Sequence, residues 1–560
     1  MTSEFKVDTP VLIVGGGPVG MTMALCLAKR GIASYLVELR VADALPDVKC
    51  NHISARSMEL FRSLGISEDL RAAGLPDDYP HDVSYRTSTL GEEIARIHIP
   101  GRTTRLTDHS GPDGNWPTPE PPHRINQRFI EPILRQHVQK EALITCLYRH
   151  QVLGFTQDEN KVSAQVQNLE LPGTSAFTLH ATYMVGCDGG RSMVRKGIDA
   201  KLVGDEVVQR VQSTCIRAPQ LISKMKVPPA WAMFTVNPRR SGNIYAIDGK
   251  EVWLIHNYLR DQEADFESVD RDWAIRAILG VDDDFEYEVM SKEDWFGRRL
   301  VSDKLQQGRV FVAGDAAHLW VPYAGYGMNA GLADASNLAW HLAAQLELWA
   351  SPLALSAYQK ERHPITEQVS RFAMNHAHAM SKRRREIPAN LEDNTPEGEI
   401  ARTTFGKDLY ELNVQQYCCA GLNFGYFYDQ SPIMLYDDET APDYSMGSFT
   451  PSTVPGCRAP HFWLAEGRSL YDELGKAYTL LCLKPVEPSA LAWLTNAAAQ
   501  ARMPLKIMDL SGLDNVPPAY KHPYVMVRSD AHTVWRGHEI TQTLADELVA
   551  VLSGHLKQAA

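Results

Sequence analysis

The stretch "TPVLIVGGGPVG", residues 9–20, joins a short β-branched run to a cluster of glycines. The run at 11–14 predicts a buried strand, and the spacing of apolar residues in "MTMALCLAKRG" predicts a helix that follows Gly20 and stops near Gly31. A second strand, "SYLVE", is predicted to end in Glu38. This order of strand, glycine turn, helix and strand predicts a Rossmann-like α/β fold.

Each glycine of this turn has its own expected role in binding a dinucleotide. Gly15 permits the tight turn, Gly17 lets a pyrophosphate approach the backbone, and Gly20 lets the helix pack closely against the strand. The N-terminus of the following helix offers free N–H groups and a positive dipole end to phosphate. Pro18 and Val19 complete the turn, and we expect them to contact the same cofactor.

The acid at the tip of the second strand is expected to bind the adenosine end of the dinucleotide. Glu38 can accept hydrogen bonds from ribose hydroxyls, and Leu39 and Arg40 lie beside it. The alternative is a glycine-rich turn of an ordinary α/β protein. The preceding strand, the following helix and the spacing to Glu38 favour the dinucleotide, although they do not distinguish FAD from NAD.

A second glycine cluster, "GRVFVAGDAAHLWVPYAGYGMNAG" at residues 308–331, again runs from a strand through an acid into a glycine loop and a helix. Asp315, at the end of the strand, is suited to accept a hydrogen bond from a sugar-alcohol hydroxyl. The residues suited to face the carbonyl of an electron-poor ring are Gly325, Gly327, Met328 and Asn329. The cluster therefore predicts a site for a flat ring that gains negative charge on reduction, which favours FAD.

Two further stretches complete an ordered set of motifs. In "YMVGCDGGRSMVRKGI", residues 183–198, an apolar strand leads to Asp188 and a glycine turn, and "RINQRFIEPIL" at 124–134 contains Gln127. With the two glycine clusters, these motifs resemble the group A flavoprotein monooxygenases, the aromatic hydroxylases built like p-hydroxybenzoate and phenol hydroxylases. The resemblance implies that Gln127 approaches the ribityl chain of FAD, and that Asp188 and Val152 belong to the same cofactor site.

The resemblance covers roughly residues 8–375 and implies a reaction. In the family, NADPH or NADH reduces FAD, dioxygen adds to C4a of the reduced flavin, and the resulting hydroperoxide transfers a hydroxyl group to an electron-rich ring. No second nucleotide motif is visible, so NAD(P)H would bind transiently near Asp188 and Arg191. We therefore expect an enzyme that hydroxylates a small phenolic or aromatic substrate with FAD, NAD(P)H and O2.

The base that removes the phenolic proton is where this chain departs from one branch of the family. Phenol hydroxylase-like members place an acid five residues before an arginine of the helix in "CNHISARSMELFRSLGI", 50–66, but here Asn51 stands five residues before Arg56. Because an amide cannot take a proton, the base lies elsewhere or the substrate needs less activation. His52 is a candidate base, although such histidines are more often structural. Asn51, His52 and Pro322 are retained as candidate catalytic residues.

The substrate is expected to meet aromatic side chains in residues 199–300, which have a strand-like pattern. Most of these aromatic residues are predicted to form a packed core. An aromatic substrate nevertheless needs flat apolar walls and a few polar groups. Tyr245, His256 and Tyr258 are the candidates for those polar groups, with Tyr245 and His256 also named as catalytic residues.

The expected architecture is a Rossmann-like FAD-binding domain, an interrupting β-sheet substrate domain and a thioredoxin-like C-terminal domain. The segments of the FAD-binding domain are 1–80, 121–198 and 301–375. The substrate domain takes 81–120 and 199–300, a helical linker region takes 376–455, and the thioredoxin-like domain takes 456–560.

The last two regions carry no predicted chemistry. The arginine run at 383–385 is interpreted as the solvated end of a helix. Thiol redox chemistry requires two cysteines in a C-x-x-C motif, whereas Cys457 and Cys482 are far apart in sequence. The C-terminal domain is therefore interpreted as structural, and it is a candidate interface for a homodimer.

Size, charge and cysteine spacing exclude several classes of protein. The chain has 560 residues, 44% of them hydrophobic, and a formal charge of −12, which disfavours nucleic acid or an anionic membrane as a partner. The nine cysteines lack metal-ligand spacing, so we expect reduced thiols, no bound metal and a cytoplasmic protein. Residues 11–28 are uncharged, but glycines and a proline interrupt them, so no membrane anchor or signal peptide is expected.

Three other functions are compatible with the same motifs. A related FAD enzyme could insert oxygen in Baeyer–Villiger fashion, or epoxidise a polycyclic or polyketide substrate. A non-oxygenating FAD oxidoreductase or a flavin-binding scaffold without turnover would share the cofactor site. Oxygen-18 in the product distinguishes the oxygenases, and NADPH oxidation stimulated by a phenol distinguishes an enzyme from a scaffold.

Overall fold

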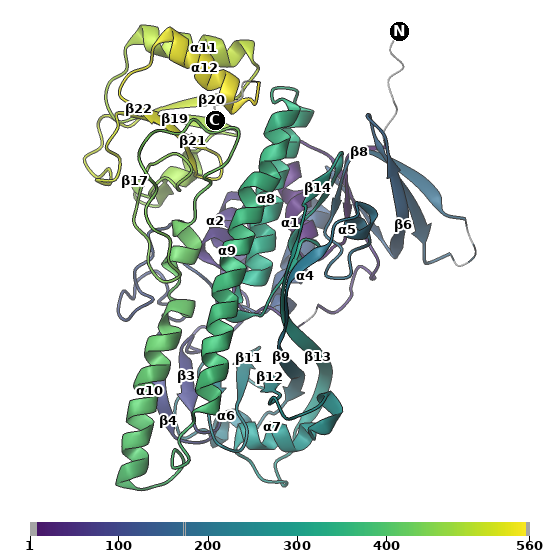
Figure 1. Cartoon of the computed structure of the whole chain (residues 1–560), viewed down its shortest axis with the longest axis vertical. Coiled ribbons are helices and arrows are strands. Elements are labelled where there is room, and N and C mark those ends of the chain that lie inside the picture. The colour runs from purple at the N-terminus through teal and green to yellow at the C-terminus, as the bar shows by residue number, and fades with distance from the viewer. Residues whose placement is uncertain (1–7, 47, 172, 174, 556–560) are drawn as a thin grey trace.

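The computed structural model describes residues 8–46, 48–171, 173 and 175–555. Three parts, each built on a sheet, are arranged along the long axis of the molecule (Figure 1). The C-terminal sheet lies at one end and a large second sheet at the other. The sheet that carries the glycine motifs lies between them, and the long helices α8 to α10 run alongside.

The first sheet has the strand order β14-β15-β8-β1-β2-β5, and the β6–β7 hairpin pairs with β8. Its strands are β1 (Thr9–Val14), β2 (Ser34–Glu38), β5 (Ile144–Tyr148), β6 (His150–Gln157), β7 (Val162–Asn168), β8 (Phe177–Gly186), β14 (Gln306–Gln307) and β15 (Val310–Val312). β1 pairs in parallel with β2 and β8, and β15 pairs in parallel with β8. The carboxyl ends of β1, β8 and β15 therefore meet at one edge, where the three predicted motifs follow them.

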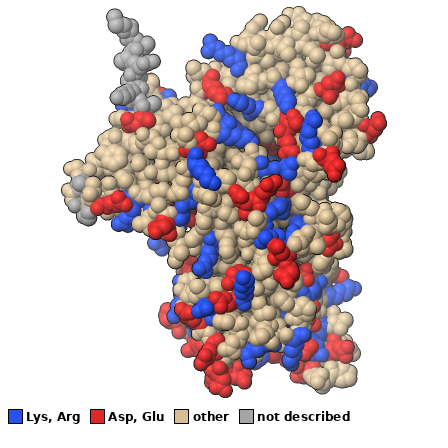
Figure 2. All heavy atoms as spheres, turned by 180° about the vertical axis from the view of Figure 1, so that it is seen from behind, with Lys and Arg blue, Asp and Glu red and all other residues tan. Residues whose placement is uncertain are grey.

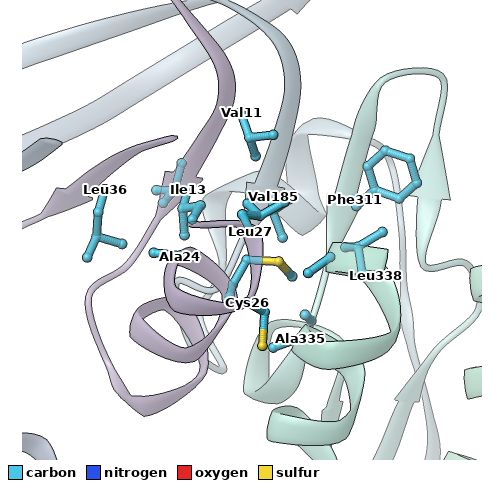
Figure 3. Packing of buried hydrophobic residues seen from close by; sticks show 14 of the residues in the cluster. Val11, Ile13, Ala24, Cys26, Leu27, Leu36, Val185, Phe311, Ala335 and Leu338 are labelled. Carbon is cyan, nitrogen blue, oxygen red and sulfur yellow. The ribbon is translucent and has the colours of Figure 1, made fainter. Parts of the chain in front are cut away.

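Two helices on this sheet, α1 (Pro18–Ala28) and α8 (Tyr326–Leu346), pack against each other. α1 is buried from Gly20 to its end, which explains why its sequence is apolar on all sides. Figure 3 shows side chains of β1, α1 and α8, among them Ile13, Leu27 and Leu338, in one core. The remaining helices of this part are α2 (Ala55–Ser63), α3 (Ser67–Arg71), α4 (Gln127–Lys140) and α5 (Met193–Gly197).

The second sheet has the order β16-β13-β9-β12-β11-β10-β3-β4. Its strands are β3 (Val83–Arg86), β4 (Glu93–Ile97), β9 (Leu202–Arg217), β10 (Ala232–Thr235), β11 (Gly242–Ala246), β12 (Val252–Tyr258), β13 (Glu288–Ser302) and β16 (His318–Leu319). The short α6 (Leu221–Lys224) and the longer α7 (Arg271–Leu279) belong to this part. α7 packs on one face, because a Cβ at Gly242 would lie 2.4 Å from Ile278. The long helices α9 (Pro352–Arg385) and α10 (Pro396–Tyr417) extend beside this sheet (Figure 1).

The C-terminal part has a four-stranded sheet of order β20-β19-β21-β22, in which only β19 and β20 are parallel. Its elements are β17 (Trp463–Ala465), β18 (Arg468–Ser469), β19 (Tyr478–Cys482), α11 (Pro488–Gln500), β20 (Leu505–Asp509), β21 (Tyr524–Arg528), β22 (Thr533–Gly537) and α12 (Gln542–Leu552). The thioredoxin-like assignment stays a prediction. A buried bidentate ion pair attaches this part to α9, with Nη1 and Nη2 of Arg528 each 2.8 Å from an oxygen of the Glu361 carboxylate.

The surface shows no concentration of one charge on the face seen in Figure 2, where basic and acidic side chains are interspersed. Within the described ranges, no helix has the length and apolar character needed to cross a membrane. The same residues contain no group of three or more His, Cys, Asp or Glu side chains that could hold a metal ion.

Candidate active site

The first glycine turn has the geometry that its sequence predicts. Gly15 has φ +105°, a conformation that favours glycine, and a Cβ on Gly20 would lie 1.9 Å from the Gly15 carbonyl oxygen. Gly17 is different, because no described atom lies within 4 Å of where its Cβ would be. Two glycines therefore serve close packing within the chain, and the third leaves room for a phosphate at the N-terminus of α1.

Glu38 holds the glycine turn from the end of β2. Its Oε2 accepts a hydrogen bond from Gly16 N at 2.6 Å, and its Oε1 accepts from Arg40 N at 2.8 Å. A carboxylate oxygen can accept a second hydrogen bond, so a ribose hydroxyl can share this site. Arg40 also contacts Glu131 in α4 at 3.4 Å, and Gln127 donates to Glu131 at 2.7 Å. One polar network thus connects the predicted adenosine residues with Gln127.

Two other predicted cofactor residues lie in contrasting settings. Leu39 is exposed directly after β2, where its side chain can cover a bound ring. Val152 is buried in β6 opposite Val166 and packs in the core of the first sheet, so its side chain serves packing. Contact of either residue with FAD stays a prediction.

Asp188 acts as a helix cap in the structure. Its carboxylate accepts hydrogen bonds from Ser192 Oγ at 2.5 Å and from Met193 N at 2.7 Å, at the start of α5. From the same helix, Arg195 donates to the carbonyl of Ala316 at 3.0 Å. The motif around Asp188 therefore positions the loop after β15, and direct contact of Asp188 with the cofactor stays a prediction.

Asp315 is available to a ligand. Its side chain is exposed and has no hydrogen-bond partner among the residues that the structure describes. Solvent reaches this carboxyl, yet the protein surrounds it closely enough that desolvation raises its pKa. A buried triad holds the turn in place, since Asp334 contacts His318 Nε2 at 2.7 Å and Arg362 Nε at 2.9 Å. Gly314 N donates to the same Asp334 carboxylate at 3.1 Å.

The glycine loop before α8 leaves backbone groups free. Gly325 has φ +62°, and no described atom lies within 4 Å of a Cβ placed on Gly327. α8 begins at Tyr326, and within the described part of the chain no side chain caps it. Asn329 is the fourth residue of the helix, so its N–H has the Gly325 carbonyl as acceptor, whereas the earlier N–H groups, including that of Met328, have no intrahelical acceptor. They are suited to a ring carbonyl that becomes negative.

The side chain of Asn329 has a positioning role instead. Its Oδ1 accepts from Ser54 N at 2.8 Å, and its Nδ2 donates to the carbonyl of His52 at 3.0 Å. A Cβ on Gly325 would lie 3.1 Å from the His52 Cβ. The segment before α2 is thus held against the glycine loop.

Two glycines allow the first and second motifs to touch. A Cβ on Gly314 would lie 2.9 Å from Val19, and one on Gly331 would lie 2.6 Å from the same side chain. Val19 therefore bridges the N-terminus of α1 and the loop before α8. A phosphate site and a ring site at two adjoining helix N-termini, with the exposed acceptor Asp315 beside them, fit an extended dinucleotide such as FAD.

The three predicted substrate residues Tyr245, His256 and Tyr258 lie on one face of the second sheet. The Tyr245 ring lies 5.6 Å from the rings of both His256 and Trp231, and Asn243 Nδ2 donates to the Tyr258 hydroxyl at 2.6 Å. Burial lowers the pKa of His256 to about 4, so this ring is neutral at pH 7. We call the rings gathered here the aromatic wall, which consists of Tyr85, Trp231, Phe234, Tyr245, His256, Tyr258 and Trp295.

The candidate base His52 is buried and already has a partner. Arg124 Nη1 lies 2.5 Å from His52 Nδ1, and because a guanidinium only donates, this nitrogen is the acceptor. Burial, and then the charge of Arg124, hold the pKa of His52 well below its usual range, which disfavours it as a base. Asn51 accepts from Asn126 Nδ2 at 2.5 Å and so helps to position α4, while Pro322 is exposed before the glycine loop.

Sequence reasoning missed two arginines at the aromatic wall. Arg384 lies in the last turn of α9, as predicted, but it is not solvated: its guanidinium carbon lies 3.7 Å from the Tyr258 ring centroid, and it donates to the Tyr323 hydroxyl at 3.2 Å. Arg124 lies 4.6 Å from the Trp231 ring centroid and 5.8 Å from that of Tyr417 in α10. Packing of α9 and α4 against the second sheet creates both contacts, and no local pattern signals them.

Known proteins that are similar to this chain bind FAD, as the geometry of the site predicts. The family model described as "FAD binding domain" matches residues 8–373. The chain is 28% identical over 582 residues to the FAD-dependent monooxygenase apdD of Emericella nidulans, covering 99% of this chain and 92% of that protein. It is 28% identical over 600 residues to the Phenol 2-monooxygenase of a Pseudomonas species, covering 98% and 93%.

The fold is also similar to that of a solved flavoprotein. The structure of the rebeccamycin biosynthetic enzyme RebC with reduced flavin matches with a TM-score of 0.88 and 31% identity, covering 98% of this chain and 99% of that one. The glycine geometry, the exposed Asp315 and these matches lead to the same conclusion. The chain belongs to the FAD binding domain family, and it is an FAD-dependent monooxygenase of the group A aromatic type.

Proposed function

We propose that the protein uses NAD(P)H and O2 to hydroxylate a phenolic ring. The observation that carries this proposal is that the ring-binding loop adjoins the aromatic wall. Gly325 packs on His52, His52 is hydrogen-bonded to Arg124, and Arg124 lies on Trp231. A substrate on the wall would therefore lie next to a flavin held by the glycine loop.

The proposed contributions of this chain are binding, orientation and exclusion of water. FAD, when bound and reduced, supplies the activated oxygen. The aromatic wall offers flat apolar surface to a ring, and Tyr245 and His256 offer it hydrogen bonds. The N–H groups at the start of α8 stabilise negative charge that develops on a bound ring. The exposed Arg191, beside Asp188, is a proposed contact for the phosphates of NAD(P)H.

Few side chains on the aromatic wall could take the proton of a phenolic substrate. His52 is engaged by Arg124, and His256 is the other titratable base on the wall. With a pKa of about 4, His256 is a weak acceptor. We therefore propose a substrate that ionises readily, so that little help from a base is needed.

A polycyclic substrate is the second candidate, with hydroxylation, epoxidation or Baeyer–Villiger insertion as the reaction. It is supported by the extent of the aromatic wall and by the likeness to an enzyme of rebeccamycin biosynthesis. The test is a screen of single-ring and polycyclic phenols for stimulated NADPH oxidation, followed by mass analysis of the product under oxygen-18. Stimulated oxidation with unlabelled product, or no stimulation by any phenol, would contradict the proposal.

A further inference from the structure

Arg124 is a buried cation without an acidic partner. It is 3% exposed, and its Nη1 donates a hydrogen bond to His52. Its Nη2 is buried with no hydrogen-bond acceptor among the described residues. No described carboxylate oxygen lies within 4.0 Å of it. Burying a guanidinium in this state is costly, so such arginines are normally paired.

The surroundings of Arg124 do not neutralise its charge. The nearby carboxylate, Asp113, is already paired with Arg105 at 2.5 Å. Burial and the neighbouring arginine charges keep the pKa values of His52 and His81 well below the usual range, so both rings are neutral. Burial also lowers the pKa of His123, to about 3. This end of the aromatic wall therefore carries net positive charge.

The other end of the wall carries a second arginine of the same kind. Arg384 lies on the Tyr258 ring, donates to the Tyr323 hydroxyl, and has no described carboxylate within 4.0 Å. Tyr245 lies between the two arginines. Burial raises the pKa of Tyr245 to about 12, against the charges of both Arg384 and Arg124, so both are close enough to act on one hydroxyl.

We propose that the substrate is an aromatic acid whose carboxylate pairs with Arg124 while its ring lies on the aromatic wall. A guanidinium fork matches the two oxygens of a carboxylate, and stacking on Trp231 fixes the plane of the fork. Arg384 then faces a second polar oxygen, such as the phenolic one, at the far end of the ring system. This inference deepens the proposed function and rests on it for the location of the substrate.

The test is a comparison of acids with their own methyl esters. The full-length protein, loaded with FAD, is titrated by calorimetry with 6-hydroxy-2-naphthoate, 4-hydroxybenzoate and the methyl ester of each. A charge-assisted hydrogen bond predicts that an acid binds about 10- to 100-fold more tightly than its ester. Arg124→Met should abolish this preference, and Arg124→Lys should keep part of it, because the charge remains while the fork is lost.

Arg240→Met is the matched control, because Arg240 is also a buried arginine on an aromatic ring, Trp273, but is paired with Glu263 at 2.5 Å. It should leave the preference for acids unchanged. Equal affinity for acids and esters, no binding of either, or an unchanged preference in Arg124→Met would overturn the inference. If Arg124→Met does not fold, Arg124→Lys provides the test. A reduced preference of Arg124→Lys for acids over esters would support the proposal, and an undiminished preference would contradict it.

A bound flavin is the other source of negative oxygen near Arg124. The affinity for FAD and the reduction potential of the bound flavin are therefore measured in the same variants. A shifted potential with an unchanged preference for acids would assign Arg124 to the flavin and overturn the proposal. The titrations need neither NADPH nor turnover, so a protein that prefers acids but hydroxylates nothing would refute the proposed function alone.

Discussion

The glycine turn after β1 and the aromatic wall of the second sheet differ in the groups that they offer to a ligand. At the turn, space is created by the absence of side chains, and recognition falls to backbone N–H groups and a helix dipole. The glycines that form the turn all lie within a few positions of Gly17. At the wall, rings form the surface, and polarity comes from Arg124, just before α4, and from Arg384, in the last turn of α9.

This difference shows which part of a flavoprotein is free to vary. A backbone site tolerates almost no added atom, because a Cβ on Gly15 or Gly20 would overlap the chain itself. A side-chain site can change one ring or one charge and keep its frame. A cofactor shared by many enzymes suits the first kind of site, and a substrate particular to one enzyme suits the second.

The strongest test of the comparison is to add one methyl group to the glycine turn. Gly20→Ala places a Cβ 1.9 Å from a backbone oxygen, so we expect a loss of more than about 3 kcal/mol in the free energy of unfolding. Gly17→Ala meets open space and should fold normally while binding FAD less tightly. Urea denaturation and FAD titration of both variants check this contrast, and equal stability of the two alanine variants would refute it.

Asp315→Ala tests a side chain within the backbone-dominated region. The exposed carboxylate is expected to accept a hydrogen bond from a hydroxyl of FAD, so its removal should cost about 1.5–3 kcal/mol of FAD affinity. The melting temperature of the apoprotein should stay nearly unchanged. Asp315→Asn, which keeps an acceptor oxygen, should lose less. Unaltered FAD affinity in folded Asp315→Ala would assign another role to this residue.

His256→Phe probes the aromatic wall through the pH dependence of stability. The folded-state pKa of about 4 lies below the unfolded value of about 6.5, so the unfolded chain takes up a proton first as the pH falls. Stability contributed by the neutral ring is therefore lost from about pH 6.5 down to about pH 4. Between pH 8 and pH 5 the parent should lose about 2 kcal/mol more than the variant. Parallel curves from chemical denaturation would show that folding does not lower the pKa of His256.

The smallest effect is expected far from both regions, in the C-terminal part. Cys457 and Cys482 are buried, and burial raises the pKa of each thiol to about 11, so neither is a reactive thiolate. The double variant Cys457→Ser, Cys482→Ala should oxidise NADPH at nearly the parent rate, with a loss of about 1 kcal/mol in stability. Loss of flavin reduction in a folded, FAD-loaded double variant would instead reveal a redox role.

Sequence alone predicts the features of this molecule that depend on neighbours along the chain. The glycine turn, β2 ending in Glu38 and the exposed Asp315 follow from residue type and spacing over a few positions. Local spacing could not show that Arg384 lies on Tyr258, since a basic run at the end of a helix is ordinarily solvated. It also could not show that Arg124 engages His52, because the two are brought together only by tertiary packing.

The buried ion pair between Glu361 and Arg528 has a consequence for anyone who shortens or recombines this protein. The same helix, α9, carries Glu361 beneath the C-terminal part and Arg384 over Tyr258, about 35 Å farther along its axis. A version cut before residue 456 would leave a buried carboxylate without its cation, on the same helix that places Arg384 over the Tyr258 ring. A chimaera between relatives must accordingly exchange α9 and the C-terminal part as one piece.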